Sequence, residues 1–387
     1  MRQWPNVALG EVLKHRKEFI LLDDTEHYKR CRVQLHAKGV VLRDTVPGSD
    51  IKTKRQQVCH AGEFLVAEID AKMGGFGIVP ESLEGAVVSS HYFLFEIDGT
   101  KLDRSFLDYF IRTTGFRNQV EAQGSTNYAA IRPASVLGYQ MPLPSPLEQQ
   151  AIVSRLDTLA DKARQVNEHL DAIERDADRL LRTHIFCPPG ETLVRRPMAD
   201  LLTLRQPDVR VDRLQRYHFV GVYSFGRGVF ASVSKDGNEF AYERLSTVHA
   251  GDFIYPKLMA WEGALGVVPP ECDGLVVSPE FPVFTVNTDA VLPEVLDIYF
   301  RTPEVWPQIA EISGGTNVRR RRVQPSAFLN YEMPLPSMRT QLKLRELYRR
   351  TQALKARHTT IRRANDALIP ATLERVFGEV GAQRTSM

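Results

Sequence analysis

The sequence contains few of the residues and patterns that define several common protein classes. Its four cysteines, Cys31, Cys59, Cys187 and Cys272, form no C-x-x-C pair and accompany no paired histidines. A zinc site is therefore not expected, and the scattered cysteines favour a reducing cytoplasm. No apolar run approaches the ~20 residues that span a bilayer. The N-terminus also lacks the apolar stretch of a signal peptide, so we expect a cytoplasmic protein without a membrane partner.

Motifs for nucleotide binding and catalysis are missing as well. Gly74-Gly-Phe-Gly77 resembles part of a phosphate loop, but Pro80 intervenes before any helix, and neither G-x-x-x-x-G-K-[ST] nor G-x-G-x-x-G occurs there. There is no Asn-Pro-Pro-aromatic motif of amino-methyltransferases and no D…ExK nuclease pattern that recurs along the chain. His60 and His249 precede matching Ala-Gly pairs, where a capping or packing role is favoured. No set of nucleophile, base and oxyanion donor emerges, so the chain is expected to be non-catalytic.

Positive charge is concentrated in two segments. The chain as a whole carries a formal charge of +3 at pH 7. Residues 337–387 contain 11 basic and 4 acidic side chains, whereas residues 146–182 contain 6 basic and 8 acidic ones. The second concentration is the run Arg319–Arg322, inside an otherwise acidic segment. These two segments are therefore candidates for contact with an anionic partner.

The chain contains two copies of one unit. His60-Ala-Gly-Glu-Phe recurs as His249-Ala-Gly-Asp-Phe. Matches continue in the same order along both copies: Gly77 with Gly266, Pro80 with Pro269, Gly85 with Gly274, Ser89 with Ser278, Tyr109-Phe110 with Tyr299-Phe300, Gly124–Asn127 with Gly314–Asn317, and Met141–Ser145 with Met333–Ser337. This period is too long for a solenoid, so each copy is expected to form a domain.

Within one copy the pattern mixes strands and helices. Residues 63–69, 85–90 and 91–97 read as short strands, because β-branched and aromatic residues lie between Gly and Pro. Residues 103–113 predict a helix with its apolar residues on one side. Each copy is therefore expected to be an α+β module.

A long helix follows each module. From Ile152 the apolar residues alternate in steps of four and three, which is the spacing of a coiled coil: Leu156, Leu159, Ala163, Val166, Leu170, Ile173, Ala177 and Leu180. The first helix is expected from Leu147 to about Ile185, roughly 60 Å at 1.5 Å per residue. In the second helix, after Ser337, one seam holds Leu347, Leu354, Ile361 and Leu368, and the other holds Leu344, Thr351, His358 and Asn365.

Charge favours antiparallel pairing of these two helices. The first is net acidic, and the segment from Arg339 to Arg363 carries nine basic residues against one acidic residue, Glu346. The polar seam of the second helix weakens packing but can fix register and the choice of partner. Pro370 is expected to kink or restart the helix. A loosely packed surface helix is the alternative interpretation.

Three places in each copy have side chains suited to nucleic acid. Lys72-Met-Gly-Gly-Phe matches Trp261-Glu-Gly-Ala-Leu, with Lys257 upstream, and a cation or aromatic ring beside glycines can approach a sugar-phosphate backbone. The small polar loops at 124–127 and 314–317 suit phosphates or base edges, and equally suit a helix N-cap. The third place is the arginine run, where guanidinium groups suit guanine edges and phosphates. An ordinary hairpin tip and a solvated loop are the alternatives for the first and third places.

The copies differ most at the arginine run. The first copy has Tyr128 to Arg132 there, and the spacing between matched motifs changes at this point. This is the pattern expected if one scaffold recognises two different sequences. The candidate DNA-contacting residues are Lys72, Ser125, Thr126, Asn127, Tyr128, Arg132, Lys257, Trp261, Thr316, Asn317, Arg319, Arg320, Arg321 and Arg322.

With these features, the sequence resembles the specificity (S) subunits of type I restriction–modification enzymes. The resemblance is carried by the duplicated module ending in Met-Pro-Leu-Pro-Ser, the long helix after each copy, and the order Gly-Thr-Asn-Val-Arg-Arg-Arg-Arg, Phe328-Leu329 and Met-Pro-Leu-Pro in the second copy. The stretch from Lys257 to Gly266 and the closing segment from Leu368 to Gly378 are also similar to the family. The resemblance covers essentially the whole chain.

This resemblance implies a division of labour between subunits. Each of two target recognition domains would recognise half of a split, asymmetric site in double-stranded DNA, and the helices would set the gap and bind two modification subunits. Those subunits bind S-adenosylmethionine, and a separate restriction subunit uses ATP and Mg²⁺ to translocate and cleave DNA, so no cofactor is expected in this chain. Ser337-Met-Arg-Thr-Gln-Leu342 lacks the glutamate of Ser145-Pro-Leu-Glu-Gln-Gln150, which leaves open whether both docking surfaces are equivalent.

We therefore expect an α+β chain in which two repeated target recognition domains are separated by two long antiparallel helices. The expected bounds are 1–145 and 187–336 for the domains, 146–186 and 337–378 for the helices, and 379–387 for a tail. Three alternatives stay open: a targeting subunit of another phage-defence DNA methylation system with the same architecture, a catalytic nuclease or methyltransferase, and a structural coiled-coil adaptor.

Overall fold

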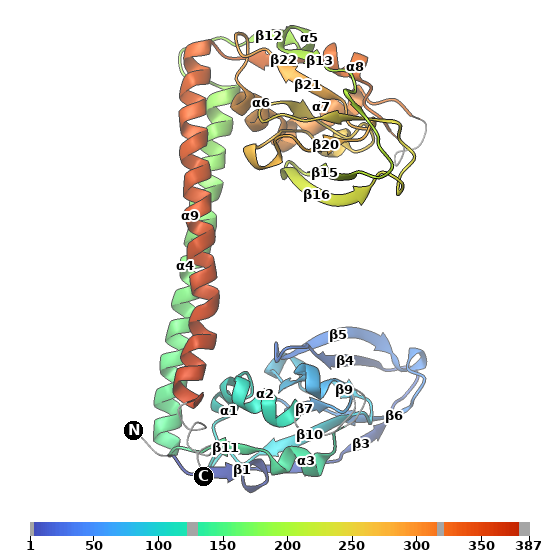
Figure 1. The fold of residues 1–387 in the computed structure, drawn as a ribbon. Coiled ribbons are helices and arrows are strands. Elements are labelled where there is room, and N and C mark those ends of the chain that lie inside the picture. Colours follow the sequence, from blue (N-terminus) through green and yellow to red (C-terminus); the bar gives the residue numbers. More distant parts are fainter. Residues whose placement is uncertain (1–3, 122–130, 316–320, 379–387) are drawn as a thin grey trace. The chain divides into compact units, whose positions relative to one another are not determined.

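The computed structural model describes residues 4–121, 131–315 and 321–378, and the chain divides into two compact units (Figure 1). Unit 1 comprises Met1–Glu168 and Thr360–Met387, and unit 2 comprises His169–Thr359. The helices α4 (Pro146–Phe186) and α9 (Met338–Phe377) each contribute to both units.

Unit 1 contains three antiparallel or mixed sheets and three short helices in its described part. The strands are β1 (Asn6–Ala8), β2 (Leu13–Arg16), β3 (Phe19–Leu21), β4 (His27–Val33), β5 (Val40–Pro47), β6 (Arg55–Val58), β7 (Phe64–Ala67), β8 (Phe76–Ile78), β9 (Val87–Val88), β10 (Tyr92–Ile97) and β11 (Gln140–Pro142). The α-helices are α1 (Arg104–Phe110), α2 (Thr114–Glu121) and α3 (Pro133–Gly138), and short 3-10 helices lie at Leu9–Glu11, Gly48–Asp50, Asp70–Met73 and Glu81–Leu83.

Unit 2 repeats this set of elements. Its strands are β12 (Val194–Pro197), β13 (Leu202–Leu204), β14 (Val209–Arg210), β15 (Arg216–Tyr223), β16 (Gly228–Asp236), β17 (Arg244–Thr247), β18 (Phe253–Ile254), β19 (Gly266–Val267), β20 (Val276–Val277), β21 (Val283–Val286) and β22 (Glu332–Leu335). Its helices are α5 (Met198–Leu201), α6 (Pro293–Phe300), α7 (Trp306–Glu311) and α8 (Pro325–Leu329), and 3-10 helices lie at Ala260–Glu262, Pro270–Cys272 and Pro303–Val305.

The sheet topology is the same in both units. Unit 1 has the strand orders β2-β10-β7-β8, β3-β6-β9-β4-β5 and β1-β11, and unit 2 has β13-β21-β18-β19, β14-β17-β20-β15-β16 and β12-β22. Even the parallel pair recurs at the predicted offset, since Arg30 pairs with Val87 and Phe219 pairs with Val276. The predicted α+β duplication is therefore confirmed. The predicted strands at 63–69, 85–90 and 91–97 and the helix at 103–113 correspond to β7, β9, β10 and α1, which are somewhat shorter.

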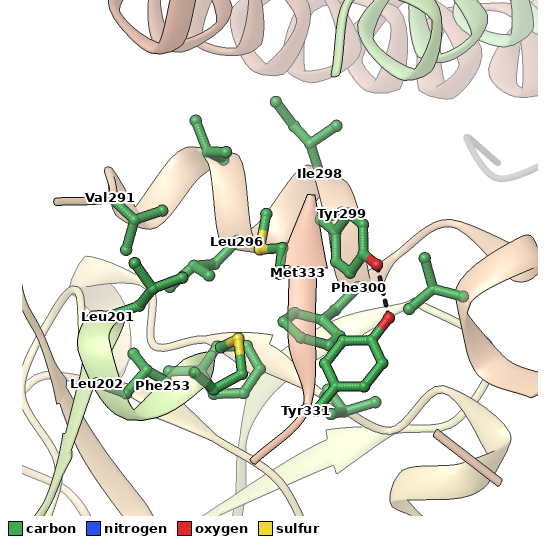
Figure 2. Packing of buried hydrophobic residues seen from close by; sticks show 14 of the residues in the cluster. Leu201, Leu202, Phe253, Val291, Leu296, Ile298, Tyr299, Phe300, Tyr331 and Met333 are labelled. Carbon is green, nitrogen blue, oxygen red and sulfur yellow. Dashed lines mark hydrogen bonds between the residues drawn. The ribbon is translucent and has the colours of Figure 1, made fainter. Parts of the chain in front are cut away.

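A buried apolar cluster in each unit joins the sheets to the long helices. In unit 2, Phe253, Phe300 and Met333 are fully buried with residues from α5 and α6 around them (Figure 2). The hydroxyl groups of Tyr299 and Tyr331 form a hydrogen bond of 2.6 Å at the edge of this cluster, drawn as a dashed line in Figure 2. Burial on this scale stabilises each module by roughly 25 cal/mol per Å² of apolar surface.

The long helices pair in antiparallel fashion within each unit, as predicted. In unit 2, His358 Nδ1 lies 2.8 Å from Glu174 Oε1, and Lys355 Nζ lies 2.7 Å from Asp178 Oδ1. In unit 1, Asn365 Nδ2 donates to Asn167 Oδ1 at 3.2 Å. Residues that lie later in α9 therefore pair with residues that lie earlier in α4, so the two helices run antiparallel. The polar pairs between the helices fix their register.

The burial of the two seams of α9 differs from the simple coiled-coil prediction. Thr351 and His358, from the polar seam, are buried, whereas Ile361 and Leu368, from the apolar seam, are 41% and 37% exposed. The polar side chains tolerate burial because His358 and its neighbours find hydrogen-bond partners on α4 or on their own helix. Some apolar residues at heptad spacing on each helix are therefore open to solvent: Ile361 and Leu368 on α9, and Val166, Ile173 and Leu180 on α4.

Pro370 does not end or restart α9, which continues to Phe377. The expectation of a restart was wrong because Leu373 and Phe377 are buried in the core of unit 1, and this packing compensates for the hydrogen bond that proline cannot donate. In the described part of the chain, neither long helix nor any other is long and apolar enough to cross a membrane.

Candidate nucleic-acid interface

Six of the candidate DNA-contacting residues lie in the described part of the chain. They are Lys72, Arg132, Lys257, Trp261, Arg321 and Arg322. The remaining candidates, Ser125, Thr126, Asn127, Tyr128, Thr316, Asn317, Arg319 and Arg320, lie outside the described residues.

In unit 2 the structure brings two of the candidate places together. The backbone N–H of Val323 donates to the carbonyl of Lys257 at 2.9 Å, and the N–H of Lys257 donates to the carbonyl of Glu280 at 3.0 Å. Arg322 pairs with Gly314 through two backbone hydrogen bonds of 2.9 Å. Its guanidinium lies 3.2 Å from a carboxylate oxygen of Glu280. The end of the arginine run therefore lies beside the segment that begins at Lys257.

Unit 1 has the same backbone arrangement with different charges. Ile131 N–H donates to the Glu68 carbonyl at 3.2 Å, and Glu68 N–H donates to the His91 carbonyl at 2.8 Å. Glu68 occupies the place of Lys257, and His91 occupies the place of Glu280. The Glu68 carboxylate lies 2.8 Å from His91 Nδ1 and 3.8 Å from Arg132 Nη1. The two units therefore present opposite charges at one shared position.

Several candidate side chains already have partners within the protein. Lys257 Nζ donates to the carbonyl of Pro279 at 2.9 Å, and Trp261 Nε1 donates to the carbonyl of Leu258 at 3.0 Å. Arg322 has an anionic partner within the protein, the carboxylate of Glu280. The side chains of Arg322 and Arg132 are still 46% and 76% exposed.

The glycine turns of the two units are close-packed against other segments of the chain. Gly74 adopts φ +78°, and a Cβ there would lie 2.7 Å from the backbone nitrogen of Ala37. Gly263, its counterpart, also adopts φ +78° and is pressed against the ring of Trp306. In unit 1 this neighbour, Ala37, belongs to the tip of the β4–β5 hairpin, and in unit 2 the tip of the β15–β16 hairpin likewise contacts Gly263 through the N–H of Gly226. The signal for these tips in the sequence is a pair of glycine-containing turns between β-rich runs, at Gly39 and at Gly226.

His60 and His249 belong to matched ionic clusters that support a turn. Hydrogen bonding to Glu84, at 2.7 Å, raises the pKa of His60 above its ordinary value, and the hydrogen bond to Glu18 adds to this effect. His249 Nδ1 lies 3.4 Å from Asp273, which occupies the position of Glu84. These contacts fit the predicted structural role.

A buried glutamine attaches each module to its long helix. Gln149, fully buried, accepts a hydrogen bond from the N–H of Asp103 at 2.8 Å and donates to the carbonyls of Lys101 and Pro144. Gln341 makes the equivalent three contacts in unit 2. The orientation of each helix start relative to its own module is therefore fixed by the same side chain.

The two helices begin with different capping arrangements. In α4, Ser145 and Glu148 form a capping box, with Ser145 Oγ 3.0 Å from the Glu148 carboxylate. In α9, Thr340 stands where Glu148 would be, and its Oγ1 donates to Glu191 at 2.6 Å. Glu191 also accepts a hydrogen bond from the backbone N–H of Ser337. Glu191 thus restores the carboxylate that the second copy lacks.

These features define a class of chain: a duplicated α+β module with matched loops of different charge, each module fixed to a pair of antiparallel helices. No family model matches the sequence. A curated relative, the type I restriction enzyme MjaVIII specificity subunit of Methanocaldococcus jannaschii, is 25% identical over 193 residues, which are 46% of this chain and 45% of that protein. The alignment thus spans less than half of the relative's length.

Solved structures share the fold over nearly the whole chain. The HsdS subunit from Thermoanaerobacter tengcongensis has a TM-score of 0.52 at 16% identity, covering 98% of this chain and 97% of that chain. A chain from a structural study of complex assembly and conformational transition of the type I R-M system has a TM-score of 0.63 at 17% identity, covering 96% of this chain and 97% of that chain. The predicted resemblance to type I specificity subunits is therefore confirmed, and the fold is that of HsdS.

Proposed function

We propose that this chain is the non-catalytic DNA-specificity subunit of a type I restriction–modification complex in the cytoplasm. Each module recognises one half of an asymmetric, bipartite site in double-stranded DNA. Adenine methylation and ATP-dependent cleavage then belong to partner subunits, which hold S-adenosylmethionine, ATP and Mg²⁺. The observation that carries the proposal is the identical strand order of the two units combined with opposite charges at one position, Glu68 in unit 1 and Lys257 in unit 2.

Methylation mapping tests this proposal directly. The chain is co-expressed with its modification subunit, and methylated adenines are mapped across the host genome. A split, asymmetric motif is expected. Replacing both Arg321 and Arg322 with alanine should relax the half-site that unit 2 recognises, because each well-placed arginine contributes about 1–3 kcal/mol of base discrimination. The matched control is Arg339→Ala, which removes an exposed positive charge at the start of α9.

Each outcome separates the alternatives. A contiguous or symmetric motif would refute the bipartite interpretation. Methylation by the purified chain alone would refute the non-catalytic one. Neighbouring genes that encode a modification subunit but no ATP-dependent translocase would favour another phage-defence methylation system. Retention of the unit 2 half-site after the double substitution would exclude those two arginines from base recognition.

The exposed apolar residues of the helices support partner docking. In unit 2, Ile173 and Leu180 of α4 are each 46% exposed, and Leu342 of α9 is 44% exposed. In unit 1, Val166 and Ile361 are 39% and 41% exposed on the same helices. Lines of half-exposed apolar residues at heptad spacing suit further helices, and one modification subunit on each unit would complete the packing.

Charge substitutions on α4 test the docking surface. Replacing Ile173 and Leu180 with glutamate should abolish co-purification of a modification subunit while the chain stays folded, because both side chains already contact solvent. Leu214→Glu serves as the control, since Leu214 is 94% exposed and lies outside the long helices. Unchanged co-purification would contradict docking at this surface.

An insertion in α4 tests the role of the helices in setting the gap. Inserting one heptad preserves the apolar pattern and lengthens the helix by roughly 10 Å. The methylated motif should keep both half-sites and change its gap. A changed half-site with a constant gap would contradict the proposal.

A further inference from the structure

The tip of the β15–β16 hairpin in unit 2 exposes a large aromatic side chain on a strained backbone. Phe225 is 62% exposed and adopts φ +63°, in the left-handed region that side chains other than glycine rarely occupy. Gly226 and Gly228 follow with φ of +63° and +90°. A phenylalanine at such a position is disfavoured both by its backbone conformation and by its contact with water, so folding alone does not account for it.

The tip is held firmly in place. The N–H of Phe225 donates to the carbonyl of Glu262 at 2.8 Å, and the N–H of Gly226 donates to the carbonyl of Gly263 at 3.0 Å. A Cβ at Gly228 would lie 2.5 Å from Nη2 of Arg301, so the hairpin sits directly on that guanidinium. The Phe225 ring meets the Trp306 ring edge-on, with centroids 6.1 Å apart. The aromatic side chain is therefore presented at a fixed position.

The same backbone device occurs in unit 1 with another side chain. His36 and Ala37 adopt φ of +62° and +53°, and their N–H groups donate to the carbonyls of Met73 and Gly74 at 2.7 and 2.9 Å. The offset that relates His60 to His249 also places His36 opposite Phe225. The strained tip thus belongs to the shared scaffold, and the exposed side chain is what differs between the two units.

The surroundings of Phe225 favour DNA as its partner. Arg227 lies next to it at the tip, with its guanidinium carbon 4.7 Å from the ring centroid of Tyr223. The Tyr223 ring is 43% exposed and stacks on Phe230 with centroids 3.8 Å apart. The carboxylate of Glu262 also contacts the tip, where it accepts a hydrogen bond of 3.3 Å from the hydroxyl group of Ser224.

The tip is also linked to the arginine run through a short segment. Within residues 257–263, the carbonyl of Lys257 accepts a hydrogen bond from the N–H of Val323, and the carbonyl of Glu262 accepts one from the N–H of Phe225. Arg322, which precedes Val323 in the chain, therefore lies near one end of this segment and Phe225 near the other. An apolar side chain held at a fixed position beside Arg227, in the module that also carries the arginine run, matches the way that proteins unstack base pairs, whereas an apolar protein partner would not select the arginines.

We propose that Phe225 inserts between neighbouring base pairs of the half-site bound by unit 2, with Arg227 on an adjacent phosphate. This inference rests on the proposed function, because it requires that unit 2 binds duplex DNA. Insertion unstacks the base pairs and bends the duplex, so base steps that deform easily are selected without hydrogen bonds to their edges. Unit 1 carries His36 at this place and therefore has no phenylalanine to insert into its half-site.

The test uses the full chain with its co-expressed modification subunit. Duplexes are first enriched from a library of random sequences, and 2-aminopurine is then placed at successive positions of the enriched sequence. Apart from a rise at any adenine that the modification subunit flips out of the duplex, binding of the unaltered chain should raise fluorescence at one step in the unit 2 half-site. Phe225→Gly should abolish that rise and weaken binding by about tenfold, in the range seen when a base loses its aromatic partner. Val233→Ala, on β16 and 58% exposed, is the matched control.

Phe225→Gly also separates function from folding. Glycine tolerates φ +63° without strain, so the melting temperature of the variant should equal or exceed that of the unaltered chain. Enrichment of a duplex with equal affinity and fluorescence for both proteins would overturn the insertion and leave the proposed function standing. Failure to enrich any duplex would overturn both. If the Phe225→Gly variant lost the modification subunit but still bound DNA, the tip would be a contact to protein, and the proposed insertion would be overturned.

Discussion

Replacing Gln341 with leucine is expected to destabilise unit 2 by about 2–4 kcal/mol. The side chain is 1% exposed, and its Oε1 accepts from the N–H of Leu292 at 2.9 Å. Its Nε2 donates to the carbonyls of Ala290 and Pro336 at 3.1 and 3.0 Å. Leucine has a similar volume but no polar atoms, so one buried donor and two acceptors lose their partner. Each such group costs about 1–3 kcal/mol, less the gain from burying an apolar side chain.

Urea denaturation and amide exchange measure this effect. With a slope of about 3 kcal/mol per M, the loss corresponds to a midpoint lower by roughly 1 M for the transition of unit 2. Exchange should accelerate in the segment around Leu292, whose N–H loses its acceptor. Gln149→Leu should produce the same effect in unit 1, with faster exchange around Asp103.

The control variant is Gln352→Leu, which makes the same chemical change at an exposed position of α9. It should change the free energy of unfolding by less than about 0.5 kcal/mol. If Gln341→Leu matched this control in midpoint and in exchange, the three hydrogen bonds would contribute no net stability, and the reasoning would be refuted.

Three further predictions concern stability. Glu191→Ala should lower the stability of unit 2 by about 1 kcal/mol, because α9 loses its cap. Adding Thr340→Glu to this variant should restore the stability in thermal melts, since the new glutamate rebuilds a capping box. Absence of this rescue would contradict the capping role of Glu191. His60→Gln should lower the melting temperature near pH 5.5 but not near pH 9. The pKa of His60 is raised in the folded protein, so its contribution to stability is complete below about pH 6.5 and is lost as the pH rises through the pKa of the folded state. A difference in melting temperature at both pH values would instead indicate a packing effect. Because 43% of that side chain is exposed, the effect should also shrink in salt. Leu344→Ala should cost about 2–5 kcal/mol in urea denaturation, as Leu344 is fully buried in the unit 2 core, and a loss below about 1 kcal/mol would contradict that packing.

The sequence predicted the architecture well because its signals are local or repeated. The heptad pattern placed the first helix at 147–185, and α4 spans Pro146–Phe186. The matched motifs, which recur in the same order along both copies, predicted two equivalent modules, and the strand orders of the two units agree. Helix periodicity and internal repetition are readable without knowledge of distant contacts, since each depends on the spacing of residues along the chain.

Most of the detail at the candidate interface depends on contacts between distant segments. The segment at Lys257 was recognised from its composition, but its position beside Arg322 comes from a hydrogen bond between Val323 and Lys257, which are far apart in the sequence. The carboxylate that caps α9 comes from Glu191, 146 residues before Ser337. The strained hairpin tip at Phe225 was not predicted at all, because a positive φ on phenylalanine runs against local preference.

The sequence by itself determined the duplication, the α+β class, the two long helices and the antiparallel sense of their pairing. Only the tertiary structure decided which seam of each helix is buried. The heptad pattern marks two lines of seam residues on α9, and composition favours burial of the line with Ile361 and Leu368. The structure buries His358 on the other line, because Glu174 on α4 supplies the partner that a buried imidazole requires. Such a choice depends on which side chains meet across the two helices, and spacing along one helix carries no information about that.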